Sequence, residues 1–286
     1  MASPYTPGLI RQKQVVHDDT IVQNEQSTKL AWKYGIELGI YMFLGYAFHA
    51  IGLQTTTASR SGFLLYLNVK LVPFFSYFIF GKTIQRNALV SALIAFSGTA
   101  LLALDNNAAL APVAGGSRLD VSFAVGDLWS IAAAATSAMF ILRMDAASKA
   151  IQNSAQLNSA NLWTVALLSL FWSVWVSYGD LHPTIKLTTL SETLSYAFLQ
   201  TCQGTVYTIT TKPIELIYLS AVTTALANYL QSIAQKKVSA ERASIFYALD
   251  PVWGAIFANL LLGEKLGVLG WVGSSLIVIA AATNAV

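Results

Sequence analysis

Charged residues are scarce in this chain. Lysine, arginine, aspartate and glutamate make up 11% of its 286 residues, whereas 55% are hydrophobic and the mean hydropathy is +0.56. A soluble domain carries roughly 25% charged residues, which it needs to cover a water-facing surface. The composition therefore excludes an ordinary soluble domain and indicates a chain whose surface meets lipid.

Cysteine and histidine are also nearly absent. The single Cys202 allows no disulfide within the chain, and the three histidines share no spacing typical of a metal site. The sequence contains no glycine-rich phosphate loop followed by lysine, and no nucleophile with a paired base. We therefore expect no enzyme, no metal and no cofactor. A net charge of +3, spread along the chain, argues against nucleic acid as a partner.

Long apolar runs dominate what is present. A run of about 20 residues can cross a bilayer as a helix, and these runs lack the alternation that a membrane barrel needs. The sequence predicts an all-α integral membrane bundle, a polytopic fold with about eight transmembrane helices. The expected spans are 34–53, 61–80, 87–104, 126–142, 159–178, 213–233, 243–262 and 268–285.

The distribution of positive charge predicts the orientation. Eleven of the 17 lysine and arginine residues fall on one side of the expected spans, which predicts that both termini are cytoplasmic. Residues 1–33 read as a polar cytosolic tail without a secretory signal. Residues 106–125 form an expected loop, as do residues 179–212, where a short interfacial helix could cover 187–203. The membrane, plasma membrane or organelle envelope, stays open.

The chain contains a weak internal repeat. Residues 58–104 match residues 240–286 at a constant offset of 182 positions without a gap, with seven identities in 47 pairs. Extended toward the N-terminus, this offset pairs the first three expected spans with the last three. The predicted orientation makes the paired spans cross the membrane in opposite directions. Membrane transporters bind their substrate between inverted repeats of this kind.

Several motifs carry a family resemblance. They are the segment 52–64, Leu71-Val72-Pro73, Gly126-Asp127-Leu128, Ser239-Ala240-Glu241-Arg242-Ala243, Asp250-Pro251-Val252 and Leu262-Gly263-Glu264-Lys265-Leu266. Their order and spacing resemble the drug/metabolite transporter superfamily of the EamA type, whose permeases consist of two inverted five-helix repeats. The resemblance implies an incomplete first repeat of three helices over 34–105 and a second repeat of five helices over 126–286. The sequence departs from the family at Lys82, which stands where the second repeat has Glu264.

Lys70 is the most informative single residue. It lies within an expected span, where an ionisable side chain costs at least about 2.5–3.5 kcal/mol to insert. Helical spacing places Tyr66, Lys70 and Pro73 on one face. One interpretation is that this face lines a translocation path. The alternative is that Lys70 forms a structural ion pair or extends to the membrane surface.

Asp250 is the counterpart of Asn68 in the repeat, two positions from Lys70. Pro251 removes a backbone hydrogen bond to Tyr247 and disfavours helical geometry at Asp250, which would leave a free carbonyl beside a carboxylate. We expect helix kinks at Pro251 and Pro73, either at a substrate site or as ordinary packing. We also hypothesise that Lys70 and Asp250 approach one another.

Two further spans offer polar residues. Asn228 and Gln231 share a face of the sixth span, and the repeat places Tyr46 and His49 opposite them. Asparagine and glutamine in membranes either join helices or contact substrate. His49 either fills a structural role or couples proton binding to transport.

The leading hypothesis is a secondary transporter that moves a small organic metabolite or drug-like solute by alternating access. The alternative is a truncated or degenerate membrane protein of the same fold that transports nothing. The expected partners are a small-molecule substrate and the lipid bilayer, and self-association as a homodimer stays open. The expected lining suits amino acids, organic anions and nucleotide-like solutes alike.

Overall fold

The computed structural model of the chain describes residues 7–56, 61, 64–81, 86–103, 125–181, 190–262 and 267–285. In this part of the chain the regular structure is helical and no strand occurs. The expected loop 106–125 lies outside the described residues apart from Val125, which begins a helix. Lys82 and Glu264 lie outside them as well.

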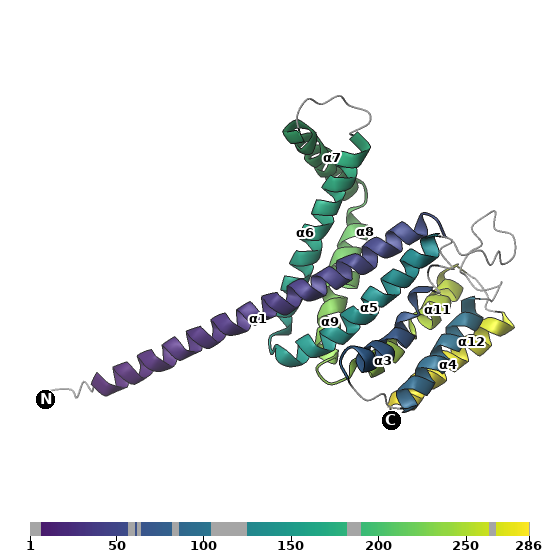
Figure 1. The fold of residues 1–286 in the computed structure, drawn as a ribbon, viewed down its shortest axis with the longest axis horizontal. Helices are drawn as coiled ribbons and strands as arrows, with labels where there is room; N and C mark the ends of the chain where they lie inside the picture. The colour runs from purple at the N-terminus through teal and green to yellow at the C-terminus, as the bar shows by residue number, and fades with distance from the viewer. Residues whose placement is uncertain are drawn as a thin grey trace.

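The helical elements form one bundle with a projecting pair of helices (Figure 1). They are α1 (Pro7–Leu53), α3 (Asn68–Phe78), α4 (Arg86–Ala103), α5 (Val125–Ala150), α6 (Ser154–Leu181), α7 (Leu190–Thr211), α8 (Pro213–Ile217), the π-helix η1 (Tyr218–Leu226), α9 (Ala227–Ala234), α10 (Ala240–Tyr247), α11 (Asp250–Leu262) and α12 (Val268–Ala285). α1 packs along α5 and α6, α4 packs along α12, and α3 contacts α5 and α10. α7 contacts α6, with which it projects from the bundle.

Several helices have the length and composition of membrane spans. Among the described residues these are Glu25–Leu53, Val125–Ala150 and Ser154–Tyr178, and Leu89–Leu101 and Val268–Thr283 are shorter apolar helices. α6 also exposes large apolar side chains on one face. Trp163, Leu167, Phe171 and Trp175 recur every four residues, and each is at least 60% exposed. An exposed apolar face of this size is suited to lipid.

Two of the expected connecting segments contain more helix than the sequence suggests. α1 begins at Pro7, so most of the tail expected over residues 1–33 is helical and extends away from the bundle (Figure 1). Proline is favoured at the first helical position, and no further proline interrupts the chain before α1 ends at Leu53. The loop expected over 179–212 contains α7, which is longer than the short helix considered there.

Two expected spans, 61–80 and 243–262, are broken at equivalent positions. Residues 66–67 form a turn before α3, and residues 248–249 form a turn between α10 and α11. In each turn two N–H groups donate to the carbonyl oxygen three residues earlier. In the first turn Leu67 donates to Leu64 at 3.1 Å and Lys70 donates to Leu67 at 3.0 Å. In the second turn Leu249 donates to Phe246 at 3.1 Å and Val252 donates to Leu249 at 2.9 Å. A shift of 182 positions superposes these bonds, and the same shift carries the bounds of α4 onto those of α12.

Three apolar clusters hold the bundle together. One joins α3 and α4 to α10, α11 and α12 through small residues such as Ala92, Ala95 and Ala280. A second joins α1, α5 and α6 around Leu38 and Met144. The third lies between them and joins α3, α5 and α10. Small residues allow close approach, because a Cβ at Gly98 of α4 would lie 2.6 Å from the carbonyl oxygen of Gly273 in α12.

Candidate functional site

A cavity of ≈ 330 Å³ lies where α1, α5 and α9 meet the two helix breaks. This volume falls within the range of about 300–1,000 Å³ that is usual for small-molecule sites. Residues that the sequence suggests for a substrate path contribute half of the lining: Tyr46, His49, Asn68, Asn228, Gln231, Tyr247 and Asp250. The other lining residues are Tyr41, Met42, Gly45, Leu65, Ser137, Phe140 and Ile141. The fold thus brings together polar and aromatic side chains that are far apart in sequence.

The two helix breaks place an equivalent pair of residues at the cavity. Asn68 is the first residue of α3, and Asp250 is the first residue of α11. Asn68 Oδ1 is buried and accepts no hydrogen bond. No described residue forms an ion pair or hydrogen bond with the Asp250 carboxylate, and Asp250 is exposed. Both side chains therefore present oxygen acceptors at the cavity.

The amide groups of α9 are already engaged within the protein. Asn228 Nδ2 donates to the carbonyl oxygen of Thr224 at 2.9 Å and to the Met42 sulfur at 3.8 Å. The Gln231 side chain hydrogen-bonds the Tyr247 side chain. These contacts join α9 to α1 and α10 beside the cavity.

A π-helix leads into this lining. η1 ends at Leu226, two residues before Asn228, and the hydroxyl of Thr224 donates to the carbonyl oxygen of Leu219, five residues earlier, at 2.8 Å. Asn158 of α6 donates to the carbonyl oxygen of Ala225 at 3.1 Å. π-helical turns are rare and occur frequently at functional sites. The expected span 213–233 is therefore built as α8, η1 and α9.

Lys70 and Tyr66 do not line the cavity. Lys70 forms no ion pair with Asp250, and its Nζ lies 4.2 Å from the centroid of the Phe96 ring on α4. Successive residues of a helix are rotated by about 100°, so Asn68 and Lys70 point about 200° apart. With Asn68 directed at the cavity, Lys70 must face α4. Tyr66 belongs to the turn before α3 and does not share its helical register.

The two prolines differ in their surroundings. Pro251 is the second residue of α11, directly after the break, where its missing N–H leaves no helical bond unmade. Pro73 lies inside the continuous helix α3 and is buried. The kink expected at Pro251 therefore corresponds to a helix break. At Pro73 the helix continues.

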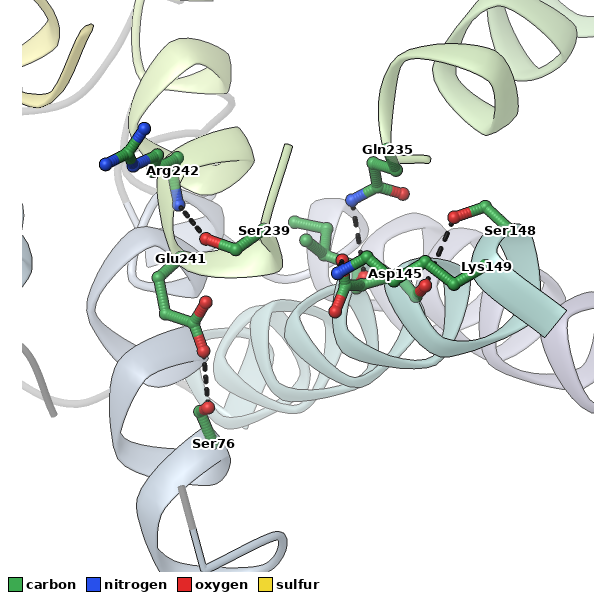
Figure 2. A network of polar contacts seen from close by, with 9 residues as sticks. Ser76, Asp145, Ser148, Lys149, Gln235, Ser239, Glu241 and Arg242 are labelled. Atoms are coloured by element: carbon green, nitrogen blue, oxygen red, sulfur yellow. Dashed lines mark hydrogen bonds and ion pairs between the residues drawn. The ribbon is translucent and has the colours of Figure 1, made fainter. Parts of the chain in front are cut away.

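On one side of the cavity, polar contacts join α3 to α10 and α5 to the residue after α9, and Figure 2 shows this network. Ser76 of α3 donates a short hydrogen bond to Glu241 of α10. Gln235 Nε2 donates to the carbonyl oxygen of Ile141, a lining residue, at 3.3 Å. One turn further along α5, Asp145 pairs with Lys149 at 2.6 Å. We call the residues that join different elements here the Glu241 closure: Ser76, Ile141, Gln235 and Glu241.

A second set of polar contacts lies on the opposite side. The hydroxyls of Ser61 and Ser130 are 2.8 Å apart, and Thr56 donates to Asp127 Oδ1 at 2.8 Å. We call these four residues the Ser130 closure. On the continuous helix α5, Ser130 and Asp145 lie on either side of the lining residues Ser137 to Ile141. The cavity therefore lies between two sets of polar contacts along this helix.

The sequence does not predict the lining residues of α5, nor those that lie before Tyr46 on α1. Ser137, Phe140 and Ile141 follow the spacing i, i+3, i+4 and therefore share a helix face. Tyr41 and Gly45 have the same relation to one another on α1. Because these helix faces carry no charged residue, their sequence pattern does not distinguish a cavity lining from ordinary helix packing. No group of three or more His, Cys, Asp or Glu residues in the described part of the chain could hold a metal ion.

The profile of the EamA-like transporter family matches residues 20–104 and 124–285. The chain belongs to the EamA-like transporter family. The resemblance to EamA-type permeases in the motifs is thereby confirmed. Membership of this family, together with the apolar helices, makes the chain an integral membrane protein. It also favours the non-enzymatic role that the sequence predicts.

Individual relatives agree with this assignment. An uncharacterized transporter of Archaeoglobus fulgidus is 24% identical over 250 residues, which cover 87% of this chain and 67% of the relative. YdzE of Bacillus subtilis, described as permease-like, is 34% identical over 61 residues, which cover 21% of this chain and 78% of that protein. A crystal structure superposes with a TM-score of 0.57 at 18% identity, over 90% of this chain and 85% of that chain, and shows the same fold.

Proposed function

We propose that this EamA-family protein is a secondary transporter that moves a small organic metabolite or drug-like solute across a membrane by alternating access. The observation that carries the proposal is the position of the cavity. It lies at two helix breaks with superposable hydrogen bonds and between two polar closures. Transporters commonly place their substrate site at discontinuous helices between their repeats.

The internal offset supports a repeat architecture for this mechanism. α3 and α4 correspond to α11 and α12 at 182 positions, and Asn68 corresponds to Asp250. If the paired helices cross the membrane in opposite directions, as the charge distribution predicts, the two halves can exchange roles. One closure then opens while the other forms, and the cavity faces each side in turn.

The closures are suited to reversible opening. The Ser61–Ser130 contact joins two neutral hydroxyls, and the Gln235–Ile141 contact joins an amide to a carbonyl. Hydrogen bonds of this kind contribute about 0.5–1.5 kcal/mol each, because solvent replaces them when they open. A few such contacts can hold one state without preventing the other. The sequence contains no nucleotide-binding loop, so the drive is a solute or ion gradient.

Uptake by reconstituted liposomes tests the proposal. Purified protein in liposomes should accumulate at least one solute from a radiolabelled panel of amino acids, amines, organic acids and nucleosides. Uptake should saturate with concentration and should be absent from liposomes without protein. If monodisperse, folded protein moves no member of the panel above the protein-free control, the proposed transport activity is contradicted.

A further inference from the structure

The charged groups at the cavity leave one uncompensated negative charge. Asp250 supplies a carboxylate and His49 an imidazole, and the lining contains no described lysine or arginine. The nearby cations are bound elsewhere. Lys70 lies over Phe96, and Arg143 is held by Glu37 through contacts of 2.5 and 2.6 Å.

Hydrogen-bond acceptors are open at the cavity as well. The amide donor of Asn228 is engaged by Thr224 and Met42, and the Gln231 side chain bonds Tyr247. Two acceptors at the cavity have no partner among the described residues, namely Asn68 Oδ1 and the Asp250 carboxylate. A buried acceptor without a partner is costly, so a ligand that donates hydrogen bonds is favoured here.

Aromatic rings complete the lining. Tyr41, Tyr46, Phe140 and Tyr247 come from three different helices and line the same cavity as the two acceptors. The faces of aromatic rings attract cations, and the attraction grows when water is excluded. A carboxylate, a free amide oxygen and four rings form a surface suited to an ammonium group on an apolar body.

We propose that the cavity binds a protonated organic amine, with its ammonium group donating to Asp250 and Asn68 Oδ1. This inference rests on the proposed function and names its substrate class. An organic anion would have to place its charge beside the Asp250 carboxylate with no lysine or arginine of the described lining to compensate. His49 could offset that charge only when protonated. Of the solute classes that the sequence leaves open, organic anions and nucleotides are therefore disfavoured.

Equilibrium binding with matched probes tests this inference. The probes are tyramine, tyrosine and 4-hydroxyphenylacetate, which share a phenol and differ in charge. Purified protein in detergent at constant ionic strength should bind radiolabelled tyramine. Unlabelled tyrosine should displace it less well than unlabelled tyramine, and 4-hydroxyphenylacetate least of all. Asp250→Asn should weaken tyramine binding at least 10-fold, because it removes the charge but keeps the shape.

Two further variants control for folding. Asp250→Glu should recover at least part of the affinity, since it restores the carboxylate. Glu215→Gln changes an exposed carboxylate of α8, outside the cavity, and should bind tyramine as the wild type does. The inference is overturned if tyramine does not bind, if 4-hydroxyphenylacetate binds as tightly, or if Asp250→Asn binds tyramine unchanged.

Flux in liposomes separates this inference from the proposed function. If organic anions are transported and tyramine is neither bound nor transported, the transporter proposal stands and the amine inference fails. If tyramine binds with the expected dependence on Asp250 but no solute crosses the membrane, the amine site stands and the transporter proposal fails.

Discussion

The Lys70 ammonium and the Phe96 ring form a pair between α3 and α4. A cation over an aromatic face gains electrostatic stabilisation without a counter-ion, which lets a lysine stay inside an apolar bundle. The sequence marks Lys70 as unusual, because an ionisable residue within an apolar run needs a partner. It could not identify that partner, since Phe96 lies on another helix and looks like any other lipid-facing or core residue.

A double-mutant cycle tests the structural role of this pair. Lys70→Met and Phe96→Leu should each lower the thermal stability of the protein in detergent. Their effects should be coupled by about 0.5–2 kcal/mol, the usual range of a cation–π contact. Strictly additive effects would show that the two side chains do not interact.

The backbones of helices α4 and α12 approach each other closely. A Cβ at Gly98 would lie 2.6 Å from the carbonyl oxygen of Gly273, closer than real Cβ contacts, so this packing favours glycine. The sequence predicts both helices, because each is an uninterrupted apolar run. Their shared bounds at the 182-residue offset are consistent with the repeat.

Gly98→Ala should therefore destabilise the protein. The new methyl group would meet a backbone carbonyl, and overpacking of this kind costs about 1–3 kcal/mol. Gly204→Ala on α7 is the matched control, because a Cβ there meets nothing within 4 Å. In an exposed helix that control substitution should be neutral or stabilise by up to about 1 kcal/mol. Equal thermal stability of the two variants would contradict the close approach of α4 and α12.

Only one of the two helix breaks can be predicted from the sequence. Pro251 indicates the break before Asp250, because proline disfavours helical geometry in the preceding residue. Nothing comparable precedes Asn68, and the apolar pattern runs through residues 66–67 without change. The first break is recognisable only through its correspondence to the second. For the same reason, the sequence does not show that Tyr66 belongs to the turn before the helix that carries Lys70.

At the scale of the whole molecule, the cavity separates two packed groups of helices. Small apolar residues hold α3 and α4 to α10, α11 and α12, while larger ones hold α1, α5 and α6. Polar and aromatic residues gather between the groups, with a closure on each side. The sequence predicts the membrane class, the family and half of the lining, because polar residues in apolar runs are conspicuous. The number of spans and the cytoplasmic termini stay predictions.

Reversible locking of the Ser130 closure is the most direct test of alternating access around this cavity. Ser61→Cys and Ser130→Cys would replace two hydroxyls that lie 2.8 Å apart, and Cys202→Ser would remove the single native thiol. Liposome uptake of the panel solute with the largest flux should stop when the double-cysteine protein is oxidised and return after reduction. Each single-cysteine protein should be insensitive to oxidation. Undiminished uptake through fully cross-linked protein would contradict the mechanism, because solute would then cross without opening this closure.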